Sequence, residues 1–468
     1  FEFFFFVLLA AVLGRWAARK FKQPAVLGEL LIGVALGAIL YELNADFVLL
    51  YRNNELINEA VNFTSANNVT WSTAIHTIFA PENTPNMDAD TRAQLMKIMQ
   101  GPEFTSQYRV VNSAILFSSF GVILLLFMVG LEISIEEMRE VGSNALVVAL
   151  LGIVLPFGTG FGAAALLIDD IDTNSAIFIG ATLAATSIGI TARVFRDMKR
   201  LQMPEAKIVL GAAVFDDILG LIILAVVSGL VTTGEISFTS IAIIMGKSIG
   251  FLVVVMFFGI KLLKSNIKFF ARLDYTNLRL LYPFGILVLL AFLADLIGLA
   301  SIVGAFAAGL ILKEEYFIDA KENLKKKGIL SEEDDTSHFS VEDIIAPIEG
   351  IFAPVFFVLM GVMVDVTTFA QLEVLLVALA LTLVAIVGKV LASVFLPKNL
   401  DKWTVGVGMV PRGEVGLIFA SIGKGLGVLD AGLFSAIIIV VILTTLITPP
   451  ALKFTIDRAE RKRQAEAA

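Results

Sequence analysis

The chain has 468 residues, of which 57% are hydrophobic and 17% are charged, and its mean hydropathy is +0.87. Soluble proteins contain about 45–50% apolar and about 25% charged residues, so this composition is typical of a protein embedded in lipid. The net charge of −8 argues against a nucleic-acid partner, and the absence of Cys excludes disulfides, thiolate metal sites and thiol catalysis.

Hydrophobic segments recur along the whole chain. A helix crosses a bilayer with about 17–25 mostly apolar residues. We therefore predict an all-α membrane protein with about 13 transmembrane helices. The predicted spans are 1–14, 25–40, 111–131, 144–167, 176–195, 208–231, 240–263, 279–297, 299–313, 346–364, 372–396, 403–423 and 432–454.

The basic residues predict the orientation of these spans. With the N-terminus outside, twenty-five of the 35 Lys and Arg residues fall in cytoplasmic loops and five in outer loops. Lys and Arg collect in cytoplasmic loops of membrane proteins, so we expect a cytoplasmic C-terminus in the cell (inner) membrane.

Polar segments and repeats divide the chain further. We expect first spans at 1–40, an outer polar insert at 41–110, the rest of a first repeat with the ion site at 111–231, linker helices at 232–298, a second repeat at 299–454 and a cytoplasmic basic tail at 455–468.

Three pairs of motifs support an internal repeat. They are VLGELLIG (26–33) with IVGAFAAG (302–309), LLFMVGLEI (125–133) with FFVLMGVMVD (356–365), and GATLAATSIGITA (180–192) with GVGMVPRGEVGLI (406–418). Chance similarity between Gly-rich segments is the alternative, but the motifs occur in the same order in both halves. An odd number of spans separates the repeats, which predicts the inverted topology of secondary transporters.

Two adjacent acids, Asp216 and Asp217, lie in the middle of the apolar span 208–231. One charge at a helix centre costs about 2.5–3.5 kcal/mol, so the pair needs a function or a partner. An interfacial helix start is the alternative, but no helix breaker or basic cluster comes directly before the pair. Adjacent helical residues point about 100° apart, so one carboxylate can meet a transported cation and the other a fixed positive charge.

Two basic residues also lie deep in spans. Lys389 has no acid near it in its own helix and is the expected counter-charge, unless it extends to the inner surface. Arg412 retains its charge, and we expect it to form a structural ion pair, with Glu414 nearby in sequence and with Glu29 and Glu132 as other possible partners.

Small, polar or Pro-containing stretches predict two broken helices, AATSIG (184–189) and GMVPRG (408–413), at matching places in the two repeats. Such breaks expose backbone carbonyls and helix ends that can coordinate ions. Thr186 and Ser187 add hydroxyl ligands for a hard monovalent cation, unless they hydrogen-bond to their own helix. The two His residues lie in polar loops, which leaves proton exchange to carboxylates.

These motifs resemble those of the second cation:proton antiporter family, and most of all its NapA-type sodium/proton antiporters. The resemblance rests on PAVLGELLIGVALG (24–37), LLFMVGLEIS (125–134), GATLAATSIGITARVF (180–195), AAVFDDILGLI (212–222), IVGAFAAGLIL (302–312) and GMVPRGEVGLI (408–418). It implies that Asp217 is the main cation and proton ligand and that Asp216 pairs with Lys389. It also implies crossed broken helices, elevator-like alternating access, a homodimer and an electrogenic mechanism without a cofactor.

We therefore expect a secondary active antiporter, and not an enzyme, that exchanges Na⁺ or Li⁺ for H⁺ across the lipid bilayer. K⁺/H⁺ exchange by the same machinery is the alternative; the lack of a C-terminal nucleotide-binding domain favours Na⁺ slightly. An intramembrane aspartyl protease would need its two Asp residues on separate helices. A passive cation channel would show flux that does not depend on protons.

Overall fold

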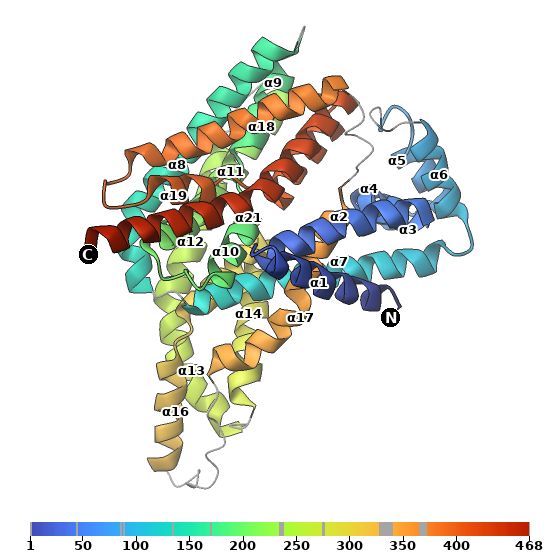
Figure 1. Cartoon of the computed structure of the whole chain (residues 1–468). Coiled ribbons are helices and arrows are strands. Elements are labelled where there is room, and N and C mark those ends of the chain that lie inside the picture. Colours follow the sequence, from blue (N-terminus) through green and yellow to red (C-terminus); the bar gives the residue numbers. More distant parts are fainter. Residues whose placement is uncertain are drawn as a thin grey trace.

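The computed structural model describes residues 2–43, 45–84, 87, 89–132, 135–168, 171–233, 238–273, 277–326, 340–364 and 372–467. All regular structure in these ranges is helical, as predicted. The helices form two bundles that meet along one side (Figure 1).

The first bundle carries the N-terminus. It contains α1 (Glu2–Lys20), α2 (Ala25–Leu43), α7 (Phe104–Glu132), α14 (Leu278–Leu296), α15 (Ser301–Ile311) and α17 (Val341–Val362). The second bundle contains α8 (Ile135–Leu167), α9 (Thr173–Ala184), α10 (Ile188–Asp197), α11 (Pro204–Thr233), α18 (Leu372–Ala392), α19 (Lys402–Gly408), α20 (Glu414–Gly425) and α21 (Ala431–Ala467). Between the repeats lie α12 (Phe238–Val254), a π-helical turn (Val255–Gly259) and α13 (Ile260–Leu273), and α16 (Glu314–Lys326) lies in the second repeat, between α15 and α17.

Each predicted span coincides with one helix or with consecutive helical segments; the span predicted at 240–263, for example, covers α12, the π-helical turn and the start of α13. Within the described ranges, nine helical segments are long and apolar enough to cross a membrane. Others are shorter or interrupted; α15, for example, has only 11 residues. The all-helical membrane fold is confirmed, whereas the number of crossings stays a prediction. The tail predicted at 455–468 continues α21 as far as Ala467.

The polar insert folds into four short helices beside α2 and α7 (Figure 1). They are α3 (Ala45–Arg52), α4 (Asn54–Asn67), α5 (Trp71–Ile78) and α6 (Ala89–Gln100). Leu50, Ile57 and Leu95 are fully buried in one apolar core with residues of α17. Residues 44, 85–86 and 88 of the insert lie outside the described ranges.

Matched glycine contacts relate the two repeats. A Cβ atom at Gly33 of α2 would collide with the α17 backbone at Val358, and one at Gly309 of α15 would collide with the α7 backbone at Phe127. Small residues allow such close helix packing in membranes. Of the other matched glycines, Gly28 lies against α1 and Gly304 against α14, whereas Gly130 lies against α15 and Gly361 against α2, so α7 packs with α15 as α17 packs with α2. This correspondence is what an inverted repeat requires.

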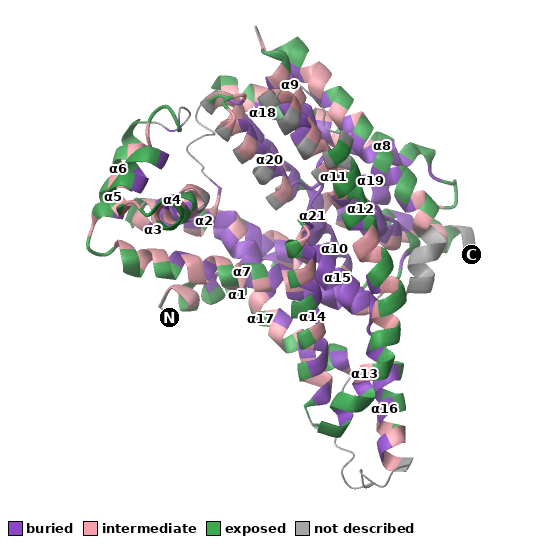
Figure 2. Ribbon diagram, turned by 180° about the vertical axis from the view of Figure 1, so that it is seen from behind, coloured by how far each residue is buried: buried purple, intermediate pink, exposed green. Residues whose placement is uncertain are grey.

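Burial is greatest where the bundles meet, around α10, α15 and α21 (Figure 2). The surfaces of α12 and α13 are largely exposed, as expected for helices that face lipid. By contrast, every described residue from Ser175 to Phe195 except Ile177 is buried, although this segment includes a helix break. The break therefore lies in the interior of the molecule.

Candidate functional site

The two predicted helix breaks cross each other inside the second bundle. The first break separates α9 from α10 at 185–187, and the second separates α19 from α20 at 409–413. The backbone N–H of Ser187 donates a hydrogen bond of 2.8 Å to the carbonyl of Pro411. Backbone groups that each helix leaves unpaired are thus partly satisfied by the other break.

A second hydrogen bond and a glycine keep the two breaks close to each other. The Thr191 hydroxyl donates a hydrogen bond of 2.7 Å to the carbonyl of Gly408, where α19 ends. A Cβ atom at Gly413 would lie only 2.6 Å from the Ser187 hydroxyl oxygen, so only glycine fits there without movement. The PRG sequence of the second break therefore makes room for the first.

Arg412 joins the C-terminal ends of two of the four half-helices. Its guanidinium donates to the carbonyls of Leu183, near the end of α9, and of Val410, just past the end of α19. Helix C-termini carry partial negative charge, so this buried cation stabilises both ends at once. Its backbone is held by α21, through Thr444 and through a hydrogen bond donated by the Thr445 hydroxyl.

The acid pair lies on α11, next to this crossing. Asp216 is 3% exposed and Lys389 is fully buried, with 3.5 Å between Lys389 Nζ and Asp216 Oδ1. Gly152 of α8 leaves space for the lysine, because a Cβ atom there would lie 3.5 Å from Nζ. The structure thus brings Asp216 together with the lysine that the sequence indicated as its counter-charge.

Asp217 differs from its neighbour in exposure. It is half-buried, whereas Asp216 is buried. This difference follows from their positions about 100° apart around α11, and it leaves Asp217 the more accessible carboxylate.

Three buried polar groups lie close together beside the helix crossing: the Thr186 hydroxyl, the Asp216 carboxylate and the Lys389 ammonium. Thr186 is 5% exposed and its side chain lies beside the Asp216 carboxylate. In the part of the chain that the structure describes, the Thr186 hydroxyl, Asp216 Oδ1 and Lys389 Nζ have no hydrogen bond of ordinary geometry. Buried polar groups almost always have a partner, so this cluster is suited to a ligand such as a cation or a proton. Ser187 is 1% exposed and its side chain is turned toward Gly413.

The ion pair predicted between Arg412 and Glu414 stays a prediction, because the Glu414 side chain lies outside the described residues. The two other acids considered as partners contact different arginines: Glu29 pairs with Arg15, and Glu132 pairs with Arg196.

Sequence reasoning missed a second charged cluster, centred on Arg193 of α10 and Glu349 of α17. Their side chains form an ion pair of 2.7 Å, and both are buried. Two signals could have indicated it: Arg193 and Asp197 are spaced for an ion pair on one helix, and Glu349 lies inside an apolar span.

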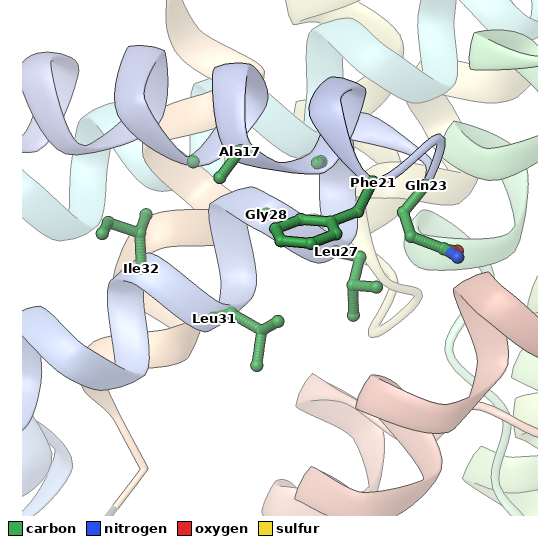
Figure 3. A pocket seen from close by; sticks show the side chains of 9 residues that line it. Ala17, Phe21, Gln23, Leu27, Gly28, Leu31 and Ile32 are labelled. Carbon is green, nitrogen blue, oxygen red and sulfur yellow. The ribbon is translucent and has the colours of Figure 1, made fainter.

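A groove of about 380 Å³ lies elsewhere, between α1 and α2 (Figure 3). It is lined mainly by apolar and small residues, among them Ala17, Phe21, Leu27 and Leu31. None of the residues around the acid pair lines it, so it is not part of the candidate ion site.

Comparison with known proteins places this geometry in a family. Residues 7–457 match the family model described as sodium/hydrogen exchanger, transmembrane. The chain belongs to the sodium/hydrogen exchanger family. The expected class, a monovalent cation:proton antiporter that spans the membrane many times, is confirmed, and members of this family are transporters and not enzymes. They need no cofactor, because the ions are substrates.

Proteins similar to this chain are also named as antiporters. The chain is 36% identical to the high-affinity Na(+)/H(+) antiporter NhaS3 of Synechocystis sp., over 98% of this chain and 90% of the relative. It is 34% identical to the Na(+)/H(+)-K(+) antiporter GerN of Bacillus cereus, over 76% of this chain and 87% of the relative. Among solved structures, the sodium proton antiporter MjNhaP1 of Methanocaldococcus jannaschii matches with a TM-score of 0.52 at 16% identity, over 98% of each chain. The last match shows the fold alone.

Proposed function

We propose that the protein is a secondary active antiporter that exchanges Na⁺, and also Li⁺, for H⁺ by alternating access. The observation that carries the proposal is the buried Asp216–Lys389 pair at the crossing of two broken helices, with the accessible Asp217 beside it. A cation and a proton that compete for one carboxylate cannot be carried together, so their movements become coupled.

Each residue of the site has its own role in this proposal. Asp217 binds the cation or the proton, and Thr186 and Ser187 supply further oxygen ligands. Lys389 pairs with Asp216 when the site holds protons, and Asp217 supplies a negative charge for the substrate. The second bundle carries this site and moves against the first bundle, so that the site opens to one side of the membrane at a time.

The exchange is electrogenic in this proposal, because Lys389 releases a second proton when Na⁺ displaces the proton from Asp217, so that two protons move for each Na⁺. The alternative substrate is K⁺. The similarity to a Bacillus cereus protein named as a Na(+)/H(+)-K(+) antiporter keeps this alternative open.

We also propose a homodimer in the inner membrane, with the N-terminus outside. Twenty-five of the 35 basic residues then lie in cytoplasmic loops. Large apolar side chains such as Phe5, Trp16 and Phe257 are 63%, 63% and 74% exposed, which suits contact with lipid or with a second copy.

The test is proton movement in proteoliposomes, recorded with a pH-sensitive dye, with and without an imposed membrane potential. We expect Na⁺ and Li⁺ to drive proton movement, K⁺ and Rb⁺ to have little effect, and the rate to change with voltage. Equal responses to K⁺ and Na⁺ would favour the alternative substrate.

The Asp217→Asn variant tests the site itself, and exchange should fall to the level of empty liposomes. Asp457→Asn is the matched control, because it removes a carboxylate from the C-terminal part of α21, where Lys453 lies 3.0 Å away. Exchange retained by a folded Asp217→Asn protein would contradict the assignment.

A further inference from the structure

A cluster of charges joins the two bundles at some distance from the acid pair. Arg193 and Arg196 of α10 each bind one oxygen of Glu349 on α17, at 2.7 and 2.8 Å. Arg196 also contacts Glu132 of α7 at 3.1 Å, and Arg193 lies 3.9 Å from Glu29 of α2. We call these five residues the inner latch, because they all lie near predicted cytoplasmic ends of their helices.

The inner latch is well shielded from water. Glu29 is fully buried, and Arg193 and Glu349 are 6% and 5% exposed. Buried ion pairs offset much of their attraction by the loss of hydration, so parting them and hydrating them is energetically feasible. Ion pairs of this kind can stabilise one conformation of the protein and still break when the protein changes to the other conformation. Alternating access requires both properties.

The same half-helix carries the latch and borders the ion site. α10 begins at Ile188, directly after Thr186 and Ser187, and Arg193 lies six residues beyond Ser187. With a rise of about 1.5 Å per residue, the two points are about 9 Å apart on one rigid element. A displacement at the ion site is therefore transmitted to the latch.

The corresponding half-helix of the second repeat is placed differently. α10 packs against α2 and α7 of the first bundle, and a Cβ atom at Gly189 would lie 3.5 Å from Val122 and 3.9 Å from Phe356. In the part of the chain that the structure describes, the main contacts of α20 are with α9, α11 and α21 of its own bundle. Of the two half-helices, α10 is thus the one that the described contacts place against the first bundle, which α21 also meets through α2.

We propose that the inner latch closes the cytoplasmic access to the ion site, and that Arg193 is a positioning residue that holds this closed state. The inference rests on the proposed alternating access and adds a specific closure to it. The state seen here is then closed on the inside, and the five charges must separate in every transport cycle before the ion can exchange with the cytoplasm.

A purely structural cluster would affect stability without changing access, so the test must measure access. The chain has no Cys, which makes any introduced thiol a unique label. Ala192→Cys is the reporter: Ala192 is fully buried and shares one face of α10 with Gly189, Arg193 and Arg196. A membrane-impermeant maleimide applied from the cytoplasmic side measures how often the interface opens.

In the reporter protein, Arg193→Gln and Glu349→Gln should each increase the labelling rate from the cytoplasmic side by about tenfold, a typical size for a shift between two coupled states. Arg193→Lys should restore most of the protection. Because both residues belong to one contact, the double variant should label little faster than either single variant.

Arg200→Gln is the matched control. Arg200 pairs with Glu460 within the second bundle, so its loss should leave the labelling rate within twofold of the parent. Unchanged labelling of folded Arg193→Gln and Glu349→Gln proteins, or equal acceleration by Arg200→Gln, would overturn the latch. Failure of the ion site is recognised separately, by exchange that survives Asp217→Asn.

Discussion

The two broken helices have similar backbones, but different charged groups lie beside their breaks. The motif alignment that relates the repeats places Thr186 opposite Arg412. The first break faces the carboxylates of α11, whereas the second faces the hydroxyls of Thr444 and Thr445 on α21. The Arg412 cation of the second repeat occupies helix ends at both breaks, through the carbonyls of Leu183 and Val410. Beside the first break, Lys389 lies 3.5 Å from Asp216, and we propose that the exchanged cation binds next to this pair.

The strongest test of this comparison removes the guanidinium group of Arg412. Arg412→Gln leaves the carbonyls of Leu183 and Val410 without their charged donor in a fully buried place. We expect a loss of about 3 kcal/mol or more in the free energy of unfolding, because two buried hydrogen bonds from a charged group are lost, each worth about 1.5–3 kcal/mol. Arg412→Lys should not restore it, because an ammonium group lacks the planar fork that reaches two acceptors.

The measurement is thermal unfolding in detergent, with Arg200→Gln as the control for loss of an exposed arginine. A melting temperature for Arg412→Gln equal to that of the control would show that the second break does not depend on its cation.

The next test concerns the charge balance of the first break. Lys389→Gln removes the partner of Asp216 while keeping a polar side chain of similar length. Exchange should continue at a reduced rate, and its dependence on membrane potential should be lost or much weaker, because Asp216 can then be neutralised by a proton. Currents on supported membranes measure this directly; a current equal to that of the parent would leave the lysine with a packing role only.

The smallest expected effects come from two threonines, one at each break. Thr445→Val removes a hydrogen bond to the Arg412 carbonyl and should cost about 1 kcal/mol of stability, without changing the apparent affinity for Na⁺. Thr186→Val removes a hydroxyl that has no hydrogen bond of ordinary geometry in the described structure. It should weaken the apparent affinity for Na⁺ severalfold and leave stability nearly unchanged.

The two predictions are tested by measuring, for both variants, the unfolding temperature and the dependence of exchange on Na⁺ concentration. The comparison between the breaks is wrong if the two threonines exchange these roles.

Much of the fold could be predicted because its signals are local. Apolar stretches of sufficient length indicate membrane helices, and the PRG and ATS sequences indicate breaks where helical hydrogen bonds stop. The charge of Lys389 and the absence of an acid close to it in its helix pointed to Asp216, because hydrocarbon allows few alternatives.

Other features depend on packing that the sequence does not record. The partners of Arg412 are backbone carbonyls, and every residue has a carbonyl, so no pattern of side chains could identify them. Glu349 and Arg193 are 156 residues apart, and their contact appears only when two bundles are docked. The helical structure of the insert was equally hidden, since its segments are too polar to be recognised as spans.

The inner latch has a consequence for the response to ionic strength. The positions of α20 that match Arg193 and Arg196 hold Phe419 and Ile422. A closure of the outer side through α20 would thus have no arginine at those positions. Dissolved salt stabilises separated, hydrated charges but does little for apolar side chains. With the proposed inner latch closing the cytoplasmic side, rising cytoplasmic salinity should therefore shift the protein toward its inward-facing form, in which the proposed ion site is open to the cytoplasm.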